Sequence, residues 1–544
     1  MTTASRAWAL RGAAVAAGLA PAFANQPFGF LPGLLGYAVL LRLLDRADPR
    51  RPLRSAFLRG WLAGLAYFVA SVWWIGEAFF VHAREQGWMA PFAVGALAAL
   101  MAVSWGGAAA LYRGLAPANA WRLLVFAGAV TAFEWLRGHV LLLTGFPWDL
   151  AGETWKAGSA PSQAASLFGA YGLSWITVAI AAAPGLGVRT RGARIGLCLA
   201  AAALAGLYGF GLWRLAAADD APAPGAPLVR IVQPDTPVRA LYDAAAFDDI
   251  ARRNLELTTR PAPRRPDIIV WSEQGLPASF NEYLAPGTWT RRAIEAALQP
   301  GQTLLSGGYR VETAPPGAYA PDGYLYFNSL IALTRSAAGL SLTATYDKHY
   351  LVAFGEYLPL DRFLTPLGVK QLVHVGDGFT PGPAPRPISP PGIPPLQPLI
   401  CYESLFSGVT RDGAQASGLR PAWILNISDD AWFGRTIGPW QHLNLASYRS
   451  IEEGLPMVRG TPTGLSAVID AEGRLEPGKL LGLGAFGVID ARLPPALPPT
   501  IFDRWGKLLF LGMLLVSLGA YAQGLDQSLR RPGGAGRAPS DGGA

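Results

Sequence analysis

Long apolar segments alternate with short polar ones over the first 214 residues of the chain. Each apolar segment carries few charges and approaches the roughly 20 residues that a helix needs to cross a bilayer. Seven such segments are centred on residues 7–24, 28–44, 60–80, 89–111, 123–143, 165–186 and 195–213, and an eighth lies at 508–523. The sequence therefore predicts a polytopic α-helical membrane domain with about eight transmembrane helices.

The character of the chain changes between the seventh and eighth segments. From about residue 220 to 502 it is richer in Pro and charged residues, and apolar runs of strand length replace the long segments. A stretch of this length can bury its own core. The expected domains are seven transmembrane helices at 1–219, a soluble domain at 220–502, an eighth transmembrane helix at 503–525 and a disordered cytoplasmic tail at 526–544.

The soluble stretch reads as an α/β domain. A helix is expected at 241–260, between strands at 228–232 and 267–272, and further strands are expected at 303–309, 326–334, 340–346 and 396–400. In α/β proteins, functional groups stand where strands end. The residues that follow these strands are therefore the first place to look for a site.

Three reactive residue types stand at or just past the ends of predicted strands: Glu273, Lys348 and Cys401. A carboxylate can take the proton of a thiol, and a fixed ammonium can favour the thiolate and hold a developing oxyanion. Alone, each has an ordinary explanation, as a solvated surface group or, for the cysteine, as a core residue. Their complementary chemistry predicts an acyl-transfer site.

Composition and charge agree with a membrane protein and suggest its orientation. Hydrophobic residues make up 51%, charged residues 15%, and the mean hydropathy is +0.26. The net charge of +8 comes from arginines concentrated at 42–59, 113–122, 189–194 and 530–537, which explains the basic excess without a nucleic-acid partner. Positive loops stay cytoplasmic, so we expect a bacterial inner membrane protein with its soluble domain in the periplasm.

Cysteine usage and the N-terminus add two expectations. The chain has two cysteines, so no disulfide framework is possible, and Cys198, inside an apolar segment, is expected in the core. Cys401 is a free thiol on an oxidising face, which favours a functional role. Residues 6–24 also fit a cleavable signal peptide, but the spans and loop charges that follow favour an uncleaved first helix.

The stretches that hold the three reactive residues resemble the carbon-nitrogen hydrolase, or nitrilase, superfamily. They read WSEQGLP at 271–277, FNSLIAL at 327–333, YDKHYLVAFGEYLP at 346–359 and CYES at 401–404. With FEWLRG at 133–138, GFPW at 145–148 and NISDDAWFGRTIGPWQH at 426–442, nearly the whole chain resembles the apolipoprotein N-acyltransferase family. The resemblance implies an αββα sandwich inserted between the seventh and eighth transmembrane helices.

The resemblance also implies roles for individual residues. Glu273 would be the general base, Lys348 the oxyanion-stabilising residue and Cys401 the nucleophile that becomes a thioester. Glu356 matches a second family glutamate that helps position the lysine or the attacking group. Substrate-binding roles are implied for Tyr402, Glu403, Asn328, Trp432 and Arg137.

The implied reaction is a ping-pong acyl transfer. Cys401 takes a fatty acyl chain from a membrane phospholipid and passes it to the α-amino group of the N-terminal S-diacylglyceryl-cysteine of an apolipoprotein. We expect a monomer in the lipid bilayer with no cofactor. No metal is expected, because the five histidines do not form ligand spacings with carboxylates or cysteine.

Other residues are candidates for the membrane side of the site. Glu134 and Arg137 lie one helical turn apart and can pair. The residues Trp423, Trp432, Phe433 and Trp440 are candidates for a lipid-facing entrance, Trp73, Trp74, Trp88 and Trp148 for an interfacial belt, and the loops 313–325 and 355–395 for a lid.

Two other functions stay open at this point. One is a membrane-tethered periplasmic amidase or nitrilase that hydrolyses a small amide, and the other is a non-enzymatic lipid- or partner-binding domain on a transporter. The chain also departs from the family pattern at Pro234-Asp235, at Tyr242 and in RGTPTG at 459–464, where details of recognition are expected to differ.

Overall fold

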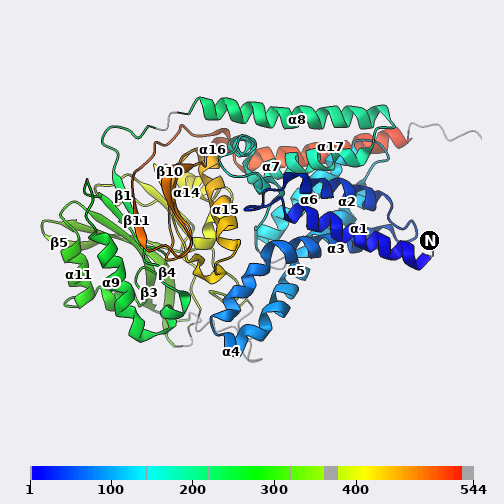
Figure 1. The fold of residues 1–544 in the computed structure, drawn as a ribbon. Helices are drawn as coiled ribbons and strands as arrows, with labels where there is room; N and C mark the ends of the chain where they lie inside the picture. The colour runs from blue at the N-terminus through cyan, green and yellow to red at the C-terminus, as the bar shows by residue number, and fades with distance from the viewer. Residues whose placement is uncertain are drawn as a thin grey trace, which may run out of the picture.

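The computed structural model describes residues 3–140, 145–218, 221–317, 320, 322–359 and 378–529. One end of the molecule is helical and the other contains two β-sheets (Figure 1). Helices form at all eight predicted apolar segments: α1 Thr3–Ala22, α2 Gly36–Asp45, α3 Pro52–Val72, α5 Ala90–Leu115, α6 Arg122–His139, α7 Ala165–Ala182, α8 Arg191–Ala216 and α17 Lys507–Leu529.

Four segments of the described chain are long and apolar enough to cross a membrane: Pro52–Phe80, Ala83–Leu115, Pro161–Leu186 and Arg191–Ala216. Lys507–Gln523 is a shorter apolar helix. The helix α2 has only 10 residues, and α6 carries Glu134 and Arg137 in its interior. The helical half is therefore a membrane domain by composition, whereas the predicted number of eight spans is not confirmed.

The soluble stretch forms a six-stranded sheet of order β11-β1-β2-β3-β4-β5 and a five-stranded sheet of order β10-β9-β8-β7-β6. In each sheet three neighbouring strands run parallel, β1 to β3 and β6 to β8. The strands are β1 Leu228–Gln233, β2 Ile268–Val270, β3 Thr303–Thr313, β4 Tyr324–Ser336, β5 Gly339–Asp347, β6 Leu396–Ile400, β7 Trp423–Ile427, β8 Met457–Gly460, β9 Ser466–Ile469, β10 Leu475–Leu481 and β11 Gly487–Arg492.

The two sheets pack face to face, because Ile231 and Leu305 of one share a core cluster with Ile400 and Leu425 of the other. The outer face of the six-stranded sheet packs on α9 Phe247–Thr258 and α11 Trp289–Ala297. The outer face of the five-stranded sheet packs on α15 Gly438–Glu453 and the helical half. These layers form the αββα sandwich that the resemblance implies. Shorter helices are α4 Ala83–Gln86, α10 Phe280–Tyr283, α14 Val409–Ser417 and α16 Ile501–Trp505.

The helix α15 lies between the sheets and the helical half (Figure 1). Every residue of α15 except Trp440 is buried, although many of its side chains are polar. Buried polar groups need hydrogen-bond partners. The helical half supplies several, since Asn444 Nδ2 donates to Glu153 O at 2.9 Å and Tyr448 Oη donates to Gly152 O at 2.9 Å.

Two expectations about the helical half are wrong. Cys198 is not a core residue, because it is exposed on α8, a helix with few buried positions. Trp74 and Trp148 do not form an interfacial belt, because they are only 1% and 2% exposed and pack against each other with ring centroids 4.8 Å apart. Trp73 and Trp88 are exposed, as a belt requires.

Some predicted features lie wholly or partly outside the described residues. These are the end of the fifth apolar segment, at 141–143, and most of the tail at 526–544. The expected lid loops also contain undescribed residues, 318, 319, 321 and 360–377.

Candidate active site

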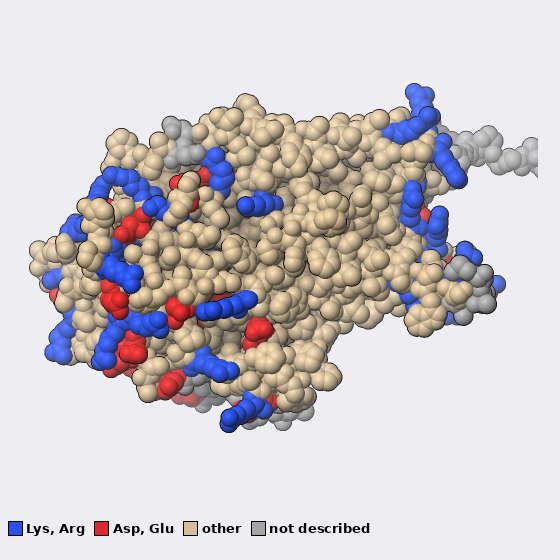
Figure 2. All heavy atoms as spheres, in the orientation of Figure 1, with Lys and Arg blue, Asp and Glu red and all other residues tan. Residues whose placement is uncertain are grey.

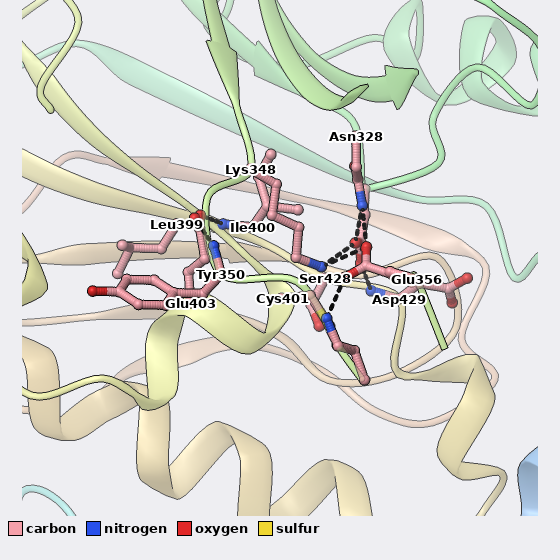
Figure 3. Close-up of polar contacts among 12 residues, drawn as sticks. Asn328, Lys348, Tyr350, Glu356, Leu399, Ile400, Cys401, Glu403, Ser428 and Asp429 are labelled. Carbon is pink, nitrogen blue, oxygen red and sulfur yellow. Dashed lines mark hydrogen bonds and ion pairs between the residues drawn. The ribbon is translucent and has the colours of Figure 1, made fainter. Parts of the chain in front are cut away.

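The three predicted site residues stand at strand ends, as expected. Lys348 directly follows β5, Cys401 directly follows β6, and Glu273 lies shortly after β2. Because the two sheets pack face to face, the ends of these strands lie close together. Figure 3 shows Lys348 and Cys401 near each other. Three segments far apart in sequence thus converge at one place.

Lys348 is held between two carboxylates. Its Nζ lies 3.2 Å from Glu273 Oε1 and 2.9 Å from Glu356 Oε1, and its side chain is 1% exposed. Asn328 on β4 donates its amide hydrogens to the same two carboxylate oxygens, at 2.8 Å each. The second oxygen of Glu273 accepts from Asp429 N at 2.8 Å. Both carboxylates are therefore fixed in position and hydrogen-bonded.

This environment keeps the lysine charged. Burial alone lowers the pKa of Lys348, but the carboxylates of Glu273 and Glu356 outweigh it and raise the pKa above its usual value. A permanent ammonium thus stands beside the thiol. It can stabilise a negative oxygen that forms there.

Cys401 is partly exposed and has a backbone φ of 49°, a left-handed conformation that is rare outside glycine. Burial raises the pKa of its thiol, and the Glu273 carboxylate raises it further, against the opposing effects of Lys348 and a hydrogen bond with Ser428. The net shift is upward, so the resting thiol holds its proton. A base must remove that proton before the sulfur can attack, and Glu273 is the carboxylate in place to do so.

Glu403 lies beneath the site. It is fully buried and accepts from Tyr346 Oη at 2.9 Å, from His349 N at 2.8 Å and from Ile400 N at 2.9 Å. Its carboxylate thus joins the chain after β5, next to Lys348, to the end of β6, next to Cys401. Figure 3 shows Glu403 pointing away from the Lys348 ammonium and towards this backbone.

Tyr402 connects the site to the helical half. Its hydroxyl donates to Gly145 O, and its ring stacks on Phe146 with centroids 6.0 Å apart and an interplanar angle of 7°. Trp432 is partly exposed in the short 3-10 helix Asp430–Phe433. Both residues therefore stand on segments that border the site.

Arg137 approaches the same loop from α6. Its Nη1 donates to Phe146 O at 2.5 Å, and its guanidinium carbon lies 5.1 Å from the centroid of the Phe68 ring. The expected Glu134–Arg137 ion pair is not among the ion pairs of the described residues, because Glu134 instead accepts from Ala151 N at 3.0 Å.

One aromatic candidate for a lipid-facing entrance does not lie at one. Trp423 begins β7, at the opposite end of the strand from the site, and is fully buried. Phe433 is partly exposed and packs on Trp74 with ring centroids 4.5 Å apart, at the interface with the helical half, so its place at an entrance stays a prediction.

Sequence reasoning missed a buried group of polar residues behind Cys401. His442 Nδ1 lies 2.9 Å from Asp430 Oδ1, Arg459 Nη2 lies 2.8 Å from Asp430 Oδ2, and His442 Nε2 lies 3.4 Å from Cys401 O. Burial raises the pKa of Asp430, but Arg459 and His442 outweigh it and lower the pKa well below its usual range. Spacing did not reveal this group, although His442 ends the family stretch at 426–442. No set of His, Cys, Asp or Glu among the described residues is arranged to hold a metal ion.

Comparisons with known proteins decide the family. Residues 17–183 match the apolipoprotein N-acyltransferase N-terminal domain, and residues 228–496 match the carbon-nitrogen hydrolase family. An apolipoprotein N-acyltransferase of Caulobacter vibrioides is 55% identical over 515 residues, covering 94% of each chain. One of Rhodopseudomonas palustris is 36% identical over 532 residues, covering 94% of this chain and 96% of its own. The chain belongs to the apolipoprotein N-acyltransferase family.

Membership of the apolipoprotein N-acyltransferase family makes the chain an acyltransferase by family, and its apolar helices make it a membrane protein. Among solved structures, an amidase from Nesterenkonia sp. matches with a TM-score of 0.32 and 17% identity, over 54% of this chain and 98% of that one. A likeness this weak supports no inference about the chain.

Two of the three places that depart from the apolipoprotein N-acyltransferase pattern, Pro234-Asp235 and the stretch 459–464, touch each other. Thr463 Oγ1 donates to Asp235 Oδ1 at 2.6 Å, and Thr236 N donates to Pro462 O at 3.3 Å. These two departures therefore form one local contact after β1 and β8, and Arg459, the first residue of the second stretch, belongs to the buried group behind Cys401.

Proposed function

We propose that the protein transfers a fatty acyl chain from a membrane phospholipid to the α-amino group of the N-terminal S-diacylglyceryl-cysteine of lipoproteins, which yields the triacylated form. One observation carries this proposal. The thiol of the partly exposed Cys401 stands beside an ammonium held between two hydrogen-bonded carboxylates, in a chain whose other half is a set of apolar helices. Hydrolysis of a small amide would give the apolar helices no role in the reaction.

In the first half-reaction Glu273 takes the proton of the Cys401 thiol, and the sulfur attacks the ester carbonyl carbon of the phospholipid. The Lys348 ammonium, 3.2 Å from Glu273 Oε1, stabilises the oxyanion of the tetrahedral intermediate. The C–O ester bond then breaks, and the proton on Glu273 passes to the leaving oxygen. The products are a lysophospholipid and a Cys401 thioester.

In the second half-reaction the free α-amine of the diacylglyceryl-cysteine attacks the thioester carbonyl. Glu273 accepts a proton from the amine, Lys348 again stabilises the oxyanion, and the C–S bond breaks. The sulfur recovers its proton, and the product is an amide. Atoms and charges balance without a cofactor.

The neighbouring residues support these steps in different ways. Glu356 positions Lys348, since its Oε1 lies 2.9 Å from Nζ and its Oε2 accepts from Val352 N at 2.8 Å. Asn328 and Glu403 direct their polar atoms at protein groups, so we assign them positioning roles. Tyr402, Trp432 and Arg137 border the site at the side of the helical half, and we propose them as substrate-contacting residues.

We further propose that all eight apolar helices cross the inner membrane and that residues 220–502 form a periplasmic domain between the seventh and eighth. The arginine-rich loops support this orientation by meeting at one end. Arg42 Nε donates to Gly185 O at 3.2 Å, and Arg122 Nε lies 3.2 Å from Asp45 Oδ2. In Figure 2 basic residues gather at the end of the helical half away from the sheets, and the surface between is almost free of charge. We expect a monomer.

The test uses the purified full chain in liposomes that contain a phospholipid labelled in its acyl chain and a synthetic diacylglyceryl-cysteine peptide. The proposal predicts label in amide linkage on the peptide and an equal amount of lysophospholipid, with neither product from Cys401→Ala. Release of labelled free fatty acid without peptide labelling, together with ammonia from small amides, would instead support the tethered amidase.

A further inference from the structure

The polar side chains of α15 fall into groups by what they touch. Among the described residues, the side chains of Gln441, Asn444 and Tyr448 form hydrogen bonds only with the helical half, through Trp74, Trp148 and Ser71 or through the loop at 152–157. Arg449 and Glu452 behave differently. Each touches the helical half and also the segment that follows Cys401, so these two side chains form a bridge between the halves.

Arg449 is the first part of this bridge. It is 1% exposed, and its Nη1 donates to Leu405 O at 2.8 Å and reaches Ser404 O at 3.4 Å. These carbonyls belong to the last residues of the short 3-10 helix Cys401–Leu405, where carbonyl groups lack partners within the helix. On its other side, Nη2 lies 3.3 Å from Oε1 of Glu153, a buried residue of the helical half.

Glu452 is the second part. Its Oε1 accepts from Ser407 Oγ at 2.7 Å and from Ala170 N of α7 at 2.7 Å, while its Oε2 lies 2.9 Å from Arg449 Nε. One guanidinium is thus shared between two buried carboxylates, one from each half. A buried charge that loses a partner is costly, so the three side chains fix one another.

The turn that they hold needs such support. Cys401 begins it with a φ of 49°, and a non-glycine residue keeps that conformation only when the surrounding structure enforces it. His442 and Glu403 restrain the start of the turn, and Arg449 and Glu452 restrain its end. The position of the thiol relative to Lys348 and Glu273 depends on both.

We propose that Glu153 of the helical half and Arg449 of α15 are positioning residues that hold the Cys401 turn in its reactive shape, so that the membrane half helps to set the geometry of the thiol. This inference rests on the proposed role of Cys401 as the nucleophile. It assigns to the helices a task besides membrane anchoring.

The test measures the alkylation rate of Cys401 by iodoacetamide against pH in the full chain, with Cys198→Ser as background. With the native turn, we expect the midpoint of the rate profile at a higher pH than for an ordinary thiol, whose pKa is about 8.5. Glu153→Gln keeps the shape of the side chain but removes its charge. We expect this variant to lower the midpoint pH of the alkylation profile towards that of an ordinary thiol. It is also expected to lower kcat of acyl transfer about 10-fold with less than about a 2-fold change in KM, as a misplaced catalytic group requires.

Tyr448→Phe is the matched control, because it removes the hydroxyl that bonds to Gly152 O and Trp155 O of the same loop without touching the Cys401 turn. Glu452→Gln is a second test variant should Glu153→Gln fail to fold. An unchanged alkylation profile in the folded variants, or the same shift in Tyr448→Phe, would overturn the inference. The alkylation profile needs no acyl transfer, so it stays informative if the proposed function fails.

Discussion

Cys401 combines two properties that ordinary cysteines lack. Its backbone is in the left-handed region, which costs on the order of 1–3 kcal/mol for a non-glycine residue, and its thiol pKa is raised by burial and by Glu273. The strained turn places the sulfur beside Lys348, and the raised pKa keeps it protonated until a base acts. Cys401 is therefore a neutral thiol at rest, and it becomes a nucleophile only when a base removes its proton.

The raised thiol pKa makes stability depend on pH. The folded protein holds this proton more tightly than the unfolded chain, so stability falls as pH rises above the ordinary value of about 8.5, by at most about 1.4 kcal/mol per pH unit. Between pH 8.5 and 10, thermal unfolding in detergent should show a steeper loss of stability for the native chain than for Cys401→Ser. Parallel curves would show that the thiol pKa is not raised.

Asn328 keeps two carboxylates in place with one amide. Replacement by Leu, which is close in shape, removes both hydrogen bonds to Glu273 and Glu356. Because hydrogen bonds to charged groups contribute about 1.5–3 kcal/mol each, we expect a lower unfolding midpoint and at least a 10-fold loss of acyl-transfer kcat. Asn281→Leu, which removes an exposed asparagine from the same domain, is the control. Equal kcat values for native and Asn328→Leu would refute the assigned role.

The sequence predicts this site only in part. Glu273, Lys348 and Cys401 can be found because each follows a recognisable strand, which is a local signal. Asn328, Glu403 and His442 each have at least one partner 28 to 57 positions away in sequence, so their roles become visible only when the strands are placed in space.

The interface between the helical half and the soluble domain depends on α15. Gln441 Oε1 accepts from the indole nitrogens of Trp74 and Trp148, at 2.8 and 3.0 Å, and its Nε2 donates to Ser71 O at 3.2 Å. All of these groups are buried. A single side chain thus satisfies two indole donors and one main-chain carbonyl between α3, the loop after α6, and α15.

Replacing Gln441 by Leu should weaken this interface. The indole N–H of Trp148 loses its hydrogen-bond partner in the interior, whereas that of Trp74 keeps a bond to Ser71 O. An unsatisfied buried donor costs about 1–3 kcal/mol. We expect a lower unfolding midpoint and easier proteolysis between the halves. Trp88→Phe, at an exposed tryptophan, is the control. Identical unfolding midpoints for both variants would contradict a structural role for the interface.

Secondary structure was largely predictable, since apolar length marks the helices and short apolar runs mark the strands. Burial was not. The helix α15 has many polar side chains, as a surface helix has, yet it lies between a sheet and the helical half because its polar groups find partners there. Trp74 and Trp148 fit an interfacial belt by position, but the packing of α15 places them inside.

The proposed orientation gives a direct prediction for the intact protein. In a Cys198→Ser background, a cysteine in place of Glu256 on α9 should react with a membrane-impermeant maleimide added to spheroplasts, because this exposed residue belongs to the proposed periplasmic domain. A cysteine in place of Arg50, which is exposed in the first basic loop, should react only after lysis. The reverse result would invert the topology.

Intact-protein mass spectrometry after mixing the protein with phospholipid alone tests the proposed chemistry most directly. The account predicts one added fatty-acyl mass on the native chain, absent from Cys401→Ala and lost when a diacylglyceryl-cysteine peptide is supplied, with the acyl group recovered on the peptide amine. No added mass on a chain whose Cys401 thiol is demonstrably free would contradict the thioester and with it the acyl-transfer mechanism.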